Sequence, residues 1–458
     1  MAKYLPELKD EDSLIDWGSI TLRHLADQVA DIPANYGFSE YYYLKEYFES
    51  LGFPHTKDDD YASCGIIGLN GICTREQFLK GMTQSYPIAQ PAERPVYSNI
   101  AFTLLMYAVE AKTGQNYTSL LETFLTEPLG LKNTKPSPGD DDSAVIPPGE
   151  STWGSDYGDN APGGGLVSTL SDLSIFLHRI LTHTALTSST ADRSWMKPTS
   201  STGSLNSLVG TPWEIYRTAA LTPAHSHVVD IYGKGGAAAG YQSQIGVIDE
   251  YGAAVIILTA GDALAVKPLY DAVLATFVPA LDEIAREQVG EKGYVGTFGA
   301  GAGAGVDGEC TDDEVAKFNI AIVQDSDSLI LESVERNGTE IMDSLKEIWS
   351  VTLGTYVPLK PIRARIYPVD IRKEEKKVIR EDWRLDWEFE SSGKTELPGA
   401  GLSDGNCLGW TLTDWIYYGS EPLDRMVFVR DAESGDVIGL EIPYLRSGVL
   451  KPVGTLET

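Results

Sequence analysis

One stretch of this chain, from Pro95 to Gly114, constrains the fold more than any other. It begins with a Tyr-x-Asn triplet at Tyr97 and Asn99, and an apolar run at helical spacing follows. The apolar residues on one face of this predicted helix are Ile100, Leu104, Leu105, Ala108 and Val109. Ser98 is the expected N-cap, and Gly114 is the expected end of the helix. Tyr97 and Asn99 are therefore predicted at the positively polarised start of a core helix, where a phenol is helped toward its ionised form.

A Tyr-x-Asn triplet by itself most often marks a tyrosine that packs at the start of a helix, so other motifs decide its meaning. Three motifs follow it in order: Pro-Leu-Gly-Leu-Lys-Asn-Thr at 128–134, Pro-Gly-Gly-Gly-Leu-Val-Ser-Thr at 162–169, and Tyr-Gly-Lys-Gly-Gly at 232–236. This ordered set resembles the serine β-lactamase and penicillin-binding-protein family. It is most similar to the class C β-lactamase-related branch, which also holds esterases, D-amino-acid peptidases and acyltransferases. The resemblance covers about residues 1–285.

The resemblance implies an α+β fold with a β-lactamase/transpeptidase-like domain over residues 1–288, in which helices cover an antiparallel sheet. The residues agree, because Val- and Ile-rich segments at 227–232, 242–247 and 253–258 are separated by glycine-rich turns, and a long helical pattern follows them. In the family, the segment with which this sequence starts comes after the nucleophile helix. We therefore expect an incomplete N-terminus that lacks one helix, two strands and the nucleophile helix.

The sequence pattern changes after residue 288. Residues 289–310 are predicted as a glycine-rich linker, and we interpret the GxGxxG spacing at 303–308 as a connector because no helical pattern directly follows it. Residues 311–458 are predicted as a β-rich domain, a sandwich or partial barrel, because apolar residues recur at every second position. The alternating residues include Ile362, Ala364, Ile366, Trp383, Leu385, Trp387 and Phe389. Fungal secreted members of the family carry a similar extra domain, so we expect a fungal origin.

Four residues form the candidate catalytic site, with roles that the resemblance implies. Tyr97 would be the general base and acid, and Asn99 would orient the acyl chain and the lysine of the nucleophile motif. Lys234 would favour the ionised form of the phenol and bind an anionic group of the substrate. The backbone N–H of Ala237 would complete the oxyanion hole. The Lys-Gly-Gly motif at 234–236 lacks the usual hydroxyl residue after the lysine, which favours an esterase- or peptidase-like site over a β-lactam site.

The nucleophile of the family is a Ser-x-x-Lys motif that precedes Tyr-x-Asn. The two such strings in this sequence, at 194–197 and 391–394, both follow it, so neither is expected to be catalytic. The sequence therefore predicts a β-lactamase-related serine hydrolase that acts on a small-molecule ester, amide or peptide substrate, and it leaves open whether this chain is an active enzyme. A non-catalytic binding protein and an acyltransferase or esterase of small-molecule biosynthesis are the alternatives. No cofactor is expected.

Charge and cysteine usage bear on partners and location. A net charge of −30 argues against nucleic acid and anionic membranes as partners. No apolar run reaches the ~20 residues of a membrane span. Cys64 and Cys73 flank a short glycine-rich loop and could form a local disulfide, while Cys310 and Cys407 both lie in the last third of the chain. Together with glycosylation sequons at 116–118 and 337–339, they predict an extracellular glycoprotein, with the cytoplasm as the alternative.

Two histidines form the remaining candidate for a metal site. His225 and His227 could share one face of a strand, as metal-binding histidines do. The sequence places no carboxylate or cysteine cluster beside them. We therefore interpret this pair as a solvated strand edge, and we expect no metal.

Overall fold

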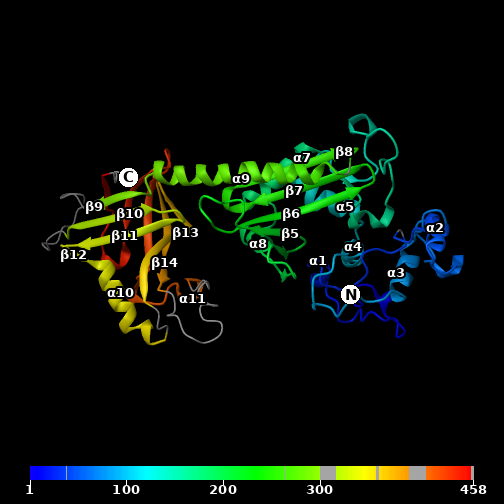
Figure 1. Ribbon diagram of the computed structural model, residues 1–458, viewed down its shortest axis with the longest axis horizontal. Helices are drawn as coiled ribbons and strands as arrows, with labels where there is room; N and C mark the ends of the chain where they lie inside the picture. The colour runs from blue at the N-terminus through cyan, green and yellow to red at the C-terminus, as the bar shows by residue number, and fades with distance from the viewer. Residues whose placement is uncertain (38, 263, 300–315, 357–359, 391–408, 455–458) are drawn as a thin grey trace. The chain divides into compact units, whose positions relative to one another are not determined.

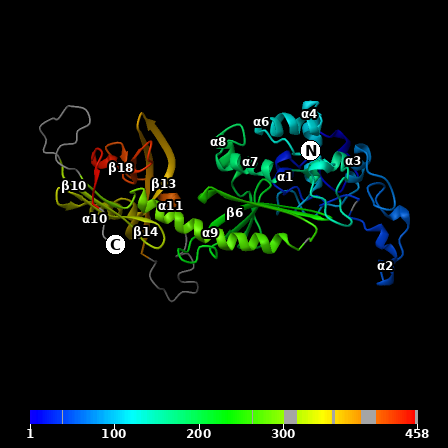
Figure 2. The same ribbon diagram turned by 90° about the horizontal axis from the view of Figure 1, so that it is seen from above.

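The computed structural model describes the chain except for residues 38, 263, 300–315, 357–359, 391–408 and 455–458. The described residues divide into two units (Figures 1 and 2). The first unit comprises residues 1–221 and 228–278, and the second comprises residues 222–227 and 279–458. The first has helices against an antiparallel sheet and the second is rich in β-strands, which confirms the predicted α+β class.

The sheet of the first unit has six antiparallel strands, which lie in chain order. They are β3 (Ser200–Ser201), β4 (Ser207–Val209), β5 (Glu214–Thr218), β6 (Val229–Ala238), β7 (Tyr241–Ile248) and β8 (Ala253–Ala260). A tight turn joins β6 to β7, and Gly240 adopts a φ of +83° there, a conformation that glycine reaches without strain. The strand signals seen in the sequence thus correspond to the three longest strands of this sheet.

Helices cover both faces of this sheet. Alternate residues of a strand point to opposite faces, and β6 shows this with Ile231 and Tyr232. Tyr232 packs in a cluster with residues of α7 (Leu170–Leu181) and α8 (Ser189–Trp195). Ile231 packs in a different cluster with residues from the first half of α9 (Val266–Glu291). The sheet therefore lies between two layers of helices.

The helix that the sequence predicted is α4 (Ile100–Thr113), and it packs with α1 (Leu22–Ala26) and α3 (Arg75–Thr83) in one apolar cluster of the first unit. The other short helices are α2 (Lys45–Ser50), α5 (Tyr117–Leu121) and α6 (Glu127–Leu129), and β1 (Lys135–Pro136) pairs with β2 (Leu166–Val167). The Ser98 hydroxyl accepts a hydrogen bond from the Ala101 N–H at 3.1 Å, and Gly114 ends the helix at a φ of +73°. The predicted end at Gly114 is confirmed, whereas the N-cap residue of α4 is Asn99, one position after the predicted Ser98.

The second unit is built on a nearly closed barrel. Its strands are β9 (Gly296–Gly299), β10 (Phe318–Gln324), β11 (Leu329–Arg336), β13 (Pro361–Glu375), β14 (Val378–Phe389), β17 (Arg425–Asp431), β18 (Val437–Glu441) and β19 (Lys451–Gly454). The order across the sheet is β18-β17-β14-β13-β11-β10-β9-β19, and β12 (Thr339–Glu340) pairs with β11. A bridge between Leu440 and Leu450 joins the ends of this order, so the sheet curls back on itself. The helix α10 (Ile341–Val351) packs against β11 and β13.

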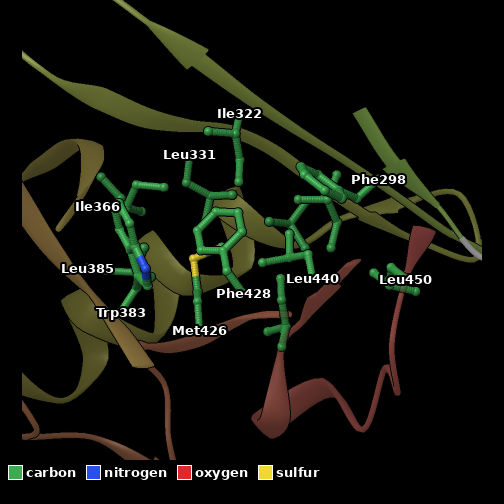
Figure 3. Packing of buried hydrophobic residues seen from close by; sticks show 14 of the residues in the cluster. Phe298, Ile322, Leu331, Ile366, Trp383, Leu385, Met426, Phe428, Leu440 and Leu450 are labelled. Carbon is green, nitrogen blue, oxygen red and sulfur yellow. The ribbon is translucent and has the colours of Figure 1, made fainter. Parts of the chain in front are cut away.

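The core of the second unit is a dense apolar cluster (Figure 3). Phe428 is fully buried at its centre, and its ring centroid lies 4.9 Å from that of Tyr294 and 5.1 Å from that of Trp383. The predicted alternation holds for Trp383 and Leu385, which are both buried. It is wrong at Ile362, which is 45% exposed, because a β-bulge between Pro361 and Arg363 shifts the register there.

The predicted local disulfide is present in the first unit. Cys64 and Cys73 are bonded, with their Cα atoms 4.9 Å apart. Cys310 and Cys407, the GxGxxG spacing and the Ser-x-x-Lys string at 391–394 lie outside the described residues. Among the described helices, none combines the length and the apolar character that a membrane span needs.

Candidate active site

The Tyr-x-Asn triplet is held by its middle residue, Ser98. Its backbone N–H donates to Gln28 Oε1 at 2.6 Å, and its carbonyl oxygen accepts from Gln28 Nε2 at 3.2 Å. The hydroxyl of Ser98 also donates to the Pro33 carbonyl at 2.7 Å. Ser98 is buried, whereas Tyr97 is 50% exposed. A buried and fully bonded backbone thus presents the exposed Tyr97 ring at the start of α4.

The side chain of Asn99 lies in a short hydrogen-bond chain. The Tyr97 hydroxyl donates to Asn99 Oδ1 at 2.8 Å, and Asn99 Nδ2 donates to Asn35 Oδ1 at 2.9 Å. The Asn99 N–H donates to the Ala34 carbonyl at 2.9 Å. These bonds fix the orientation of the amide, because its oxygen and its nitrogen each have a partner of the matching kind. Asn35 was not singled out in the sequence, where a loop asparagine carries no distinguishing signal.

Lys234 reaches the same site from β6. Its Nζ lies 5.2 Å from the centroid of the Tyr97 ring, a distance at which an ammonium is attracted to the face of a phenol ring. The structure therefore brings together two side chains from distant parts of the sequence, one at the start of α4 and one on the central sheet. Both belong to the first unit.

Glu214, on the neighbouring strand β5, also lies at this site. Its Oε1 accepts a hydrogen bond from Lys234 Nζ at 3.0 Å, and its Oε2 accepts from the Gly235 N–H at 3.3 Å. Lys234 Nζ also donates to the Gly235 carbonyl at 2.8 Å. The sequence analysis did not identify Glu214. Only the pairing of β5 with β6 in the folded protein places it beside the lysine.

Two other sequence candidates occupy different settings. Ala237 is exposed near the end of β6, where it pairs with Gln242 of β7, and its role as an oxyanion donor stays a prediction. The string at 194–197 spans the end of α8, which finishes at Trp195. Ser194 and Lys197 are therefore not on successive turns of one helix, as a serine and its lysine base would be.

The histidine pair differs from the sequence interpretation. His225 Nε2 lies 3.3 Å from Glu283 Oε2, and His227 Nε2 lies 4.0 Å from Asp282 Oδ1. The sequence did not place these two single carboxylates, which α9 brings to the loop before β6. Over the described residues, no group of three or more histidine, cysteine or acidic side chains is placed to hold a metal ion.

A buried carboxylate lies in the same part of the first unit as the triplet. Asp31 is 1% exposed, and neither of its side-chain oxygens has a hydrogen-bond partner among the described residues. Burial raises the pKa of Asp31 above its ordinary value, although Arg94 acts in the opposite direction. Its φ of 56° is one that asparagine adopts readily.

We expect Asp31→Asn to stabilise the protein at neutral pH, by roughly 1 kcal/mol. Because the pKa of Asp31 is raised in the folded state, Asp31 contributes its full free energy to stability below its unfolded-state pKa of about 3.9, where the carboxyl group is protonated. That contribution is lost as the pH rises through the folded-state pKa. The gain of the variant over the wild type should therefore grow from pH 4 to pH 7, measured by urea unfolding. The exposed Asp12→Asn is the control, and an equal gain there would contradict the explanation.

Comparisons with known proteins identify the family of the chain. The profile of the family described as Beta-lactamase matches residues 1–278. The chain belongs to the β-lactamase family. A second profile, described as Beta-lactamase-like-like, C-terminal domain, matches residues 285–453, so the barrel unit of this β-lactamase family member is also a known domain.

Relatives of this β-lactamase family member extend over nearly the whole chain. It is 42% identical over 461 residues to "Beta-lactamase-like protein" of Arthroderma benhamiae, which covers 98% of this chain and 76% of the relative. It is 27% identical over 459 residues to "Probable hydrolase M10" of Phoma sp., covering 96% and 71%. A solved D-stereospecific amidohydrolase from Streptomyces sp. is 19% identical, with a TM-score of 0.41 over 57% of this chain and 73% of that chain.

Proposed function

We propose that this chain carries the substrate cleft and the proton-transfer groups of a serine hydrolase that acts on an ester or amide bond of a small molecule or peptide. One observation carries the proposal: the Tyr97 ring and the Lys234 ammonium meet 5.2 Å apart in a member of the β-lactamase family. The proposed acyl transfer would use these two side chains together, one from the start of α4 and one from β6.

Each site residue has a role in the proposed acyl transfer. Tyr97 takes the proton of the attacking serine and later delivers it to the leaving group. Asn99, held by Asn35, orients the acyl chain. The backbone N–H of Ala237 stabilises the negative charge that develops on the carbonyl oxygen. No Ser-x-x-Lys string precedes Tyr97 in the sequence, so we assign the nucleophile to none of its residues.

Ligand binding tests the proposed site without requiring turnover. N-phenylacetylglycinamide, a small neutral amide, is expected to bind the full chain and to shift the NMR signals of the Tyr97 ring. The Asn99→Leu variant removes the amide that orients the acyl chain and should weaken this binding about tenfold. Binding that leaves Tyr97 unchanged, or equal binding by the variant, would contradict the proposal. The exposed and unrelated Asn206→Leu serves as the control.

A non-catalytic binding protein is the second candidate, because both Ser-x-x-Lys strings of this sequence follow Tyr97. It predicts ligand binding at the same cleft with no chemistry. The test is to incubate the chain with a nitrophenyl ester and a serine-reactive fluorophosphonate. A label on one serine, together with turnover that disappears in Tyr97→Phe, would exclude this candidate and identify the nucleophile.

A further inference from the structure

The hydrogen-bonding capacity of Lys234 is largely occupied within the protein. An ammonium has three N–H donors. One is directed to Glu214 Oε1 at 3.0 Å and one to the Gly235 carbonyl at 2.8 Å. The Tyr97 ring lies on a further side of the ammonium, 5.2 Å from Nζ to the ring centroid. A substrate carboxylate that approached Lys234 would therefore have to displace Glu214 or share the ammonium with it.

The carboxylate of Glu214 is fixed at the site and open to the solvent. Its two oxygens accept from different donors, the Lys234 ammonium and the Gly235 N–H, so the group is held at both ends. Its side chain is 51% exposed, compared with 31% for Lys234. The more accessible charge of this ion pair is thus the negative one, and an incoming ligand meets it first.

On β6, the two residues after Lys234 are glycines, so they provide no side-chain donor that could offset the negative charge of Glu214. Gly235 follows the lysine, and a Cβ placed on it would lie 3.0 Å from Gln244 Oε1 of β7. A Cβ on Gly236 would lie 2.6 Å from Ser243 Oγ. The contact at Gly236 is closer than real Cβ atoms show and the contact at Gly235 is tight, so side chains of β7 crowd the space beside both glycines. The charge that a ligand encounters here is therefore set by Glu214 and Lys234 together.

We propose that Glu214 is a specificity-determining residue, which makes this site select uncharged esters or amides and reject substrates that carry a carboxylate next to the reacting bond. The proposal rests on the proposed function, because it describes the substrate of that same cleft. Like charges that are brought together at a binding site disfavour the complex, and the penalty is smaller at an exposed site because water and salt screen it. Glu214 thus opposes the anion-binding role that the resemblance gave to Lys234.

A matched pair of ligands isolates this effect. N-phenylacetylglycinamide and N-phenylacetylglycine differ only in a carboxamide against a carboxylate. The wild-type chain should bind the amide about fivefold more tightly than the acid in an NMR titration at low salt. In Glu214→Gln this ratio should fall to about one or reverse, because Lys234 then faces the ligand without a competing carboxylate. The exposed Glu76→Gln makes the same change in net charge and should keep the wild-type ratio.

The outcomes separate the proposed function from the role of Glu214. If both ligands bind and Glu214→Gln leaves their ratio unchanged, Glu214 does not determine specificity, while the proposed function stands. A wild-type chain that prefers the acid leads to the same conclusion. If neither ligand binds any of the three proteins, the proposed function fails, and the inference about Glu214 fails with it. Glu214→Asp, which keeps the charge, should retain the preference for the amide.

Discussion

Truncating Phe428 to alanine is expected to lower the free energy of unfolding of the second unit by about 3–5 kcal/mol. Phe428 is fully buried, and its ring contacts three aromatic rings, those of Tyr294, Phe298 and Trp383. The truncation removes apolar surface from the core and leaves a cavity that rigid strands cannot fill. Because the strands on either side of β17 depend on this cluster, we expect the barrel as a whole to lose stability.

Native-state hydrogen exchange is the measurement that fits a chain of two units. It reports the opening free energy of β14 and β17 separately from that of the first unit. Ile362→Ala is the matched control, because Ile362 belongs to the same barrel but is 45% exposed, and it should cost less than about 1 kcal/mol. A loss for Phe428→Ala that is no larger than the loss for Ile362→Ala would show that the cluster is not the core of the barrel.

Ile362 also shows where sequence patterns stop being informative about the barrel. Period-two alternation predicted the inward positions of Ala364 and Ile366 correctly, because adjacent strand residues face opposite sides. It could not locate the bulge next to Ile362, since a single extra residue changes the register without changing composition. Closure of the barrel through Leu440 and Leu450 depends on the pairing of distant strands, which no local pattern encodes.

The residues of the candidate site were likewise predicted only in part. The motif and the helix signal placed Tyr97 correctly at the start of α4, and the ordered motifs implied that Lys234 would approach it. Glu214 and Asn35 were missed, because a glutamate at a strand end and an asparagine in a loop are common and only the tertiary fold gives them partners. The partners of a charged residue, more than the residue itself, decide which ligands it can receive.

The same reasoning applies to the helix that positions Tyr97. Sequence periodicity assigned both Leu104 and Leu105 to the core face of α4, and this holds fully only for Leu104, which is 0% exposed. Leu105 is partly buried at the margin of the same cluster. A predicted apolar stripe is wider than the contact that the helix makes, because 3.6 residues per turn place neighbouring residues about 100° apart. The two leucines therefore form a matched pair for experiment.

Leu104→Ala should destabilise the first unit by about 2–5 kcal/mol, and Leu105→Ala should cost clearly less. Leu104 anchors α4 in a buried cluster that includes Leu25, Met82 and Ile100. Tyr97 lies at the start of α4, where Ser98 holds the backbone through its hydrogen bonds. Because that start is continuous with α4, loosening α4 should also weaken binding of N-phenylacetylglycinamide. Hydrogen exchange of α4 and the NMR titration measure the two effects in the same samples.

The informative result is whether the affinity for the amide falls together with the stability of α4. If the hydrogen bonds of Ser98 alone fix the site, Leu104→Ala will destabilise α4 while the affinity for the amide stays unchanged. If packing of the helix also fixes the site, affinity will fall with stability across Leu105→Ala and then Leu104→Ala. We expect the second outcome, because Ile100 lies in the first turn of α4 and packs in the same cluster as Leu104. Because a close-packed cluster transmits strain, loosening this turn should also disturb the side chains at its start.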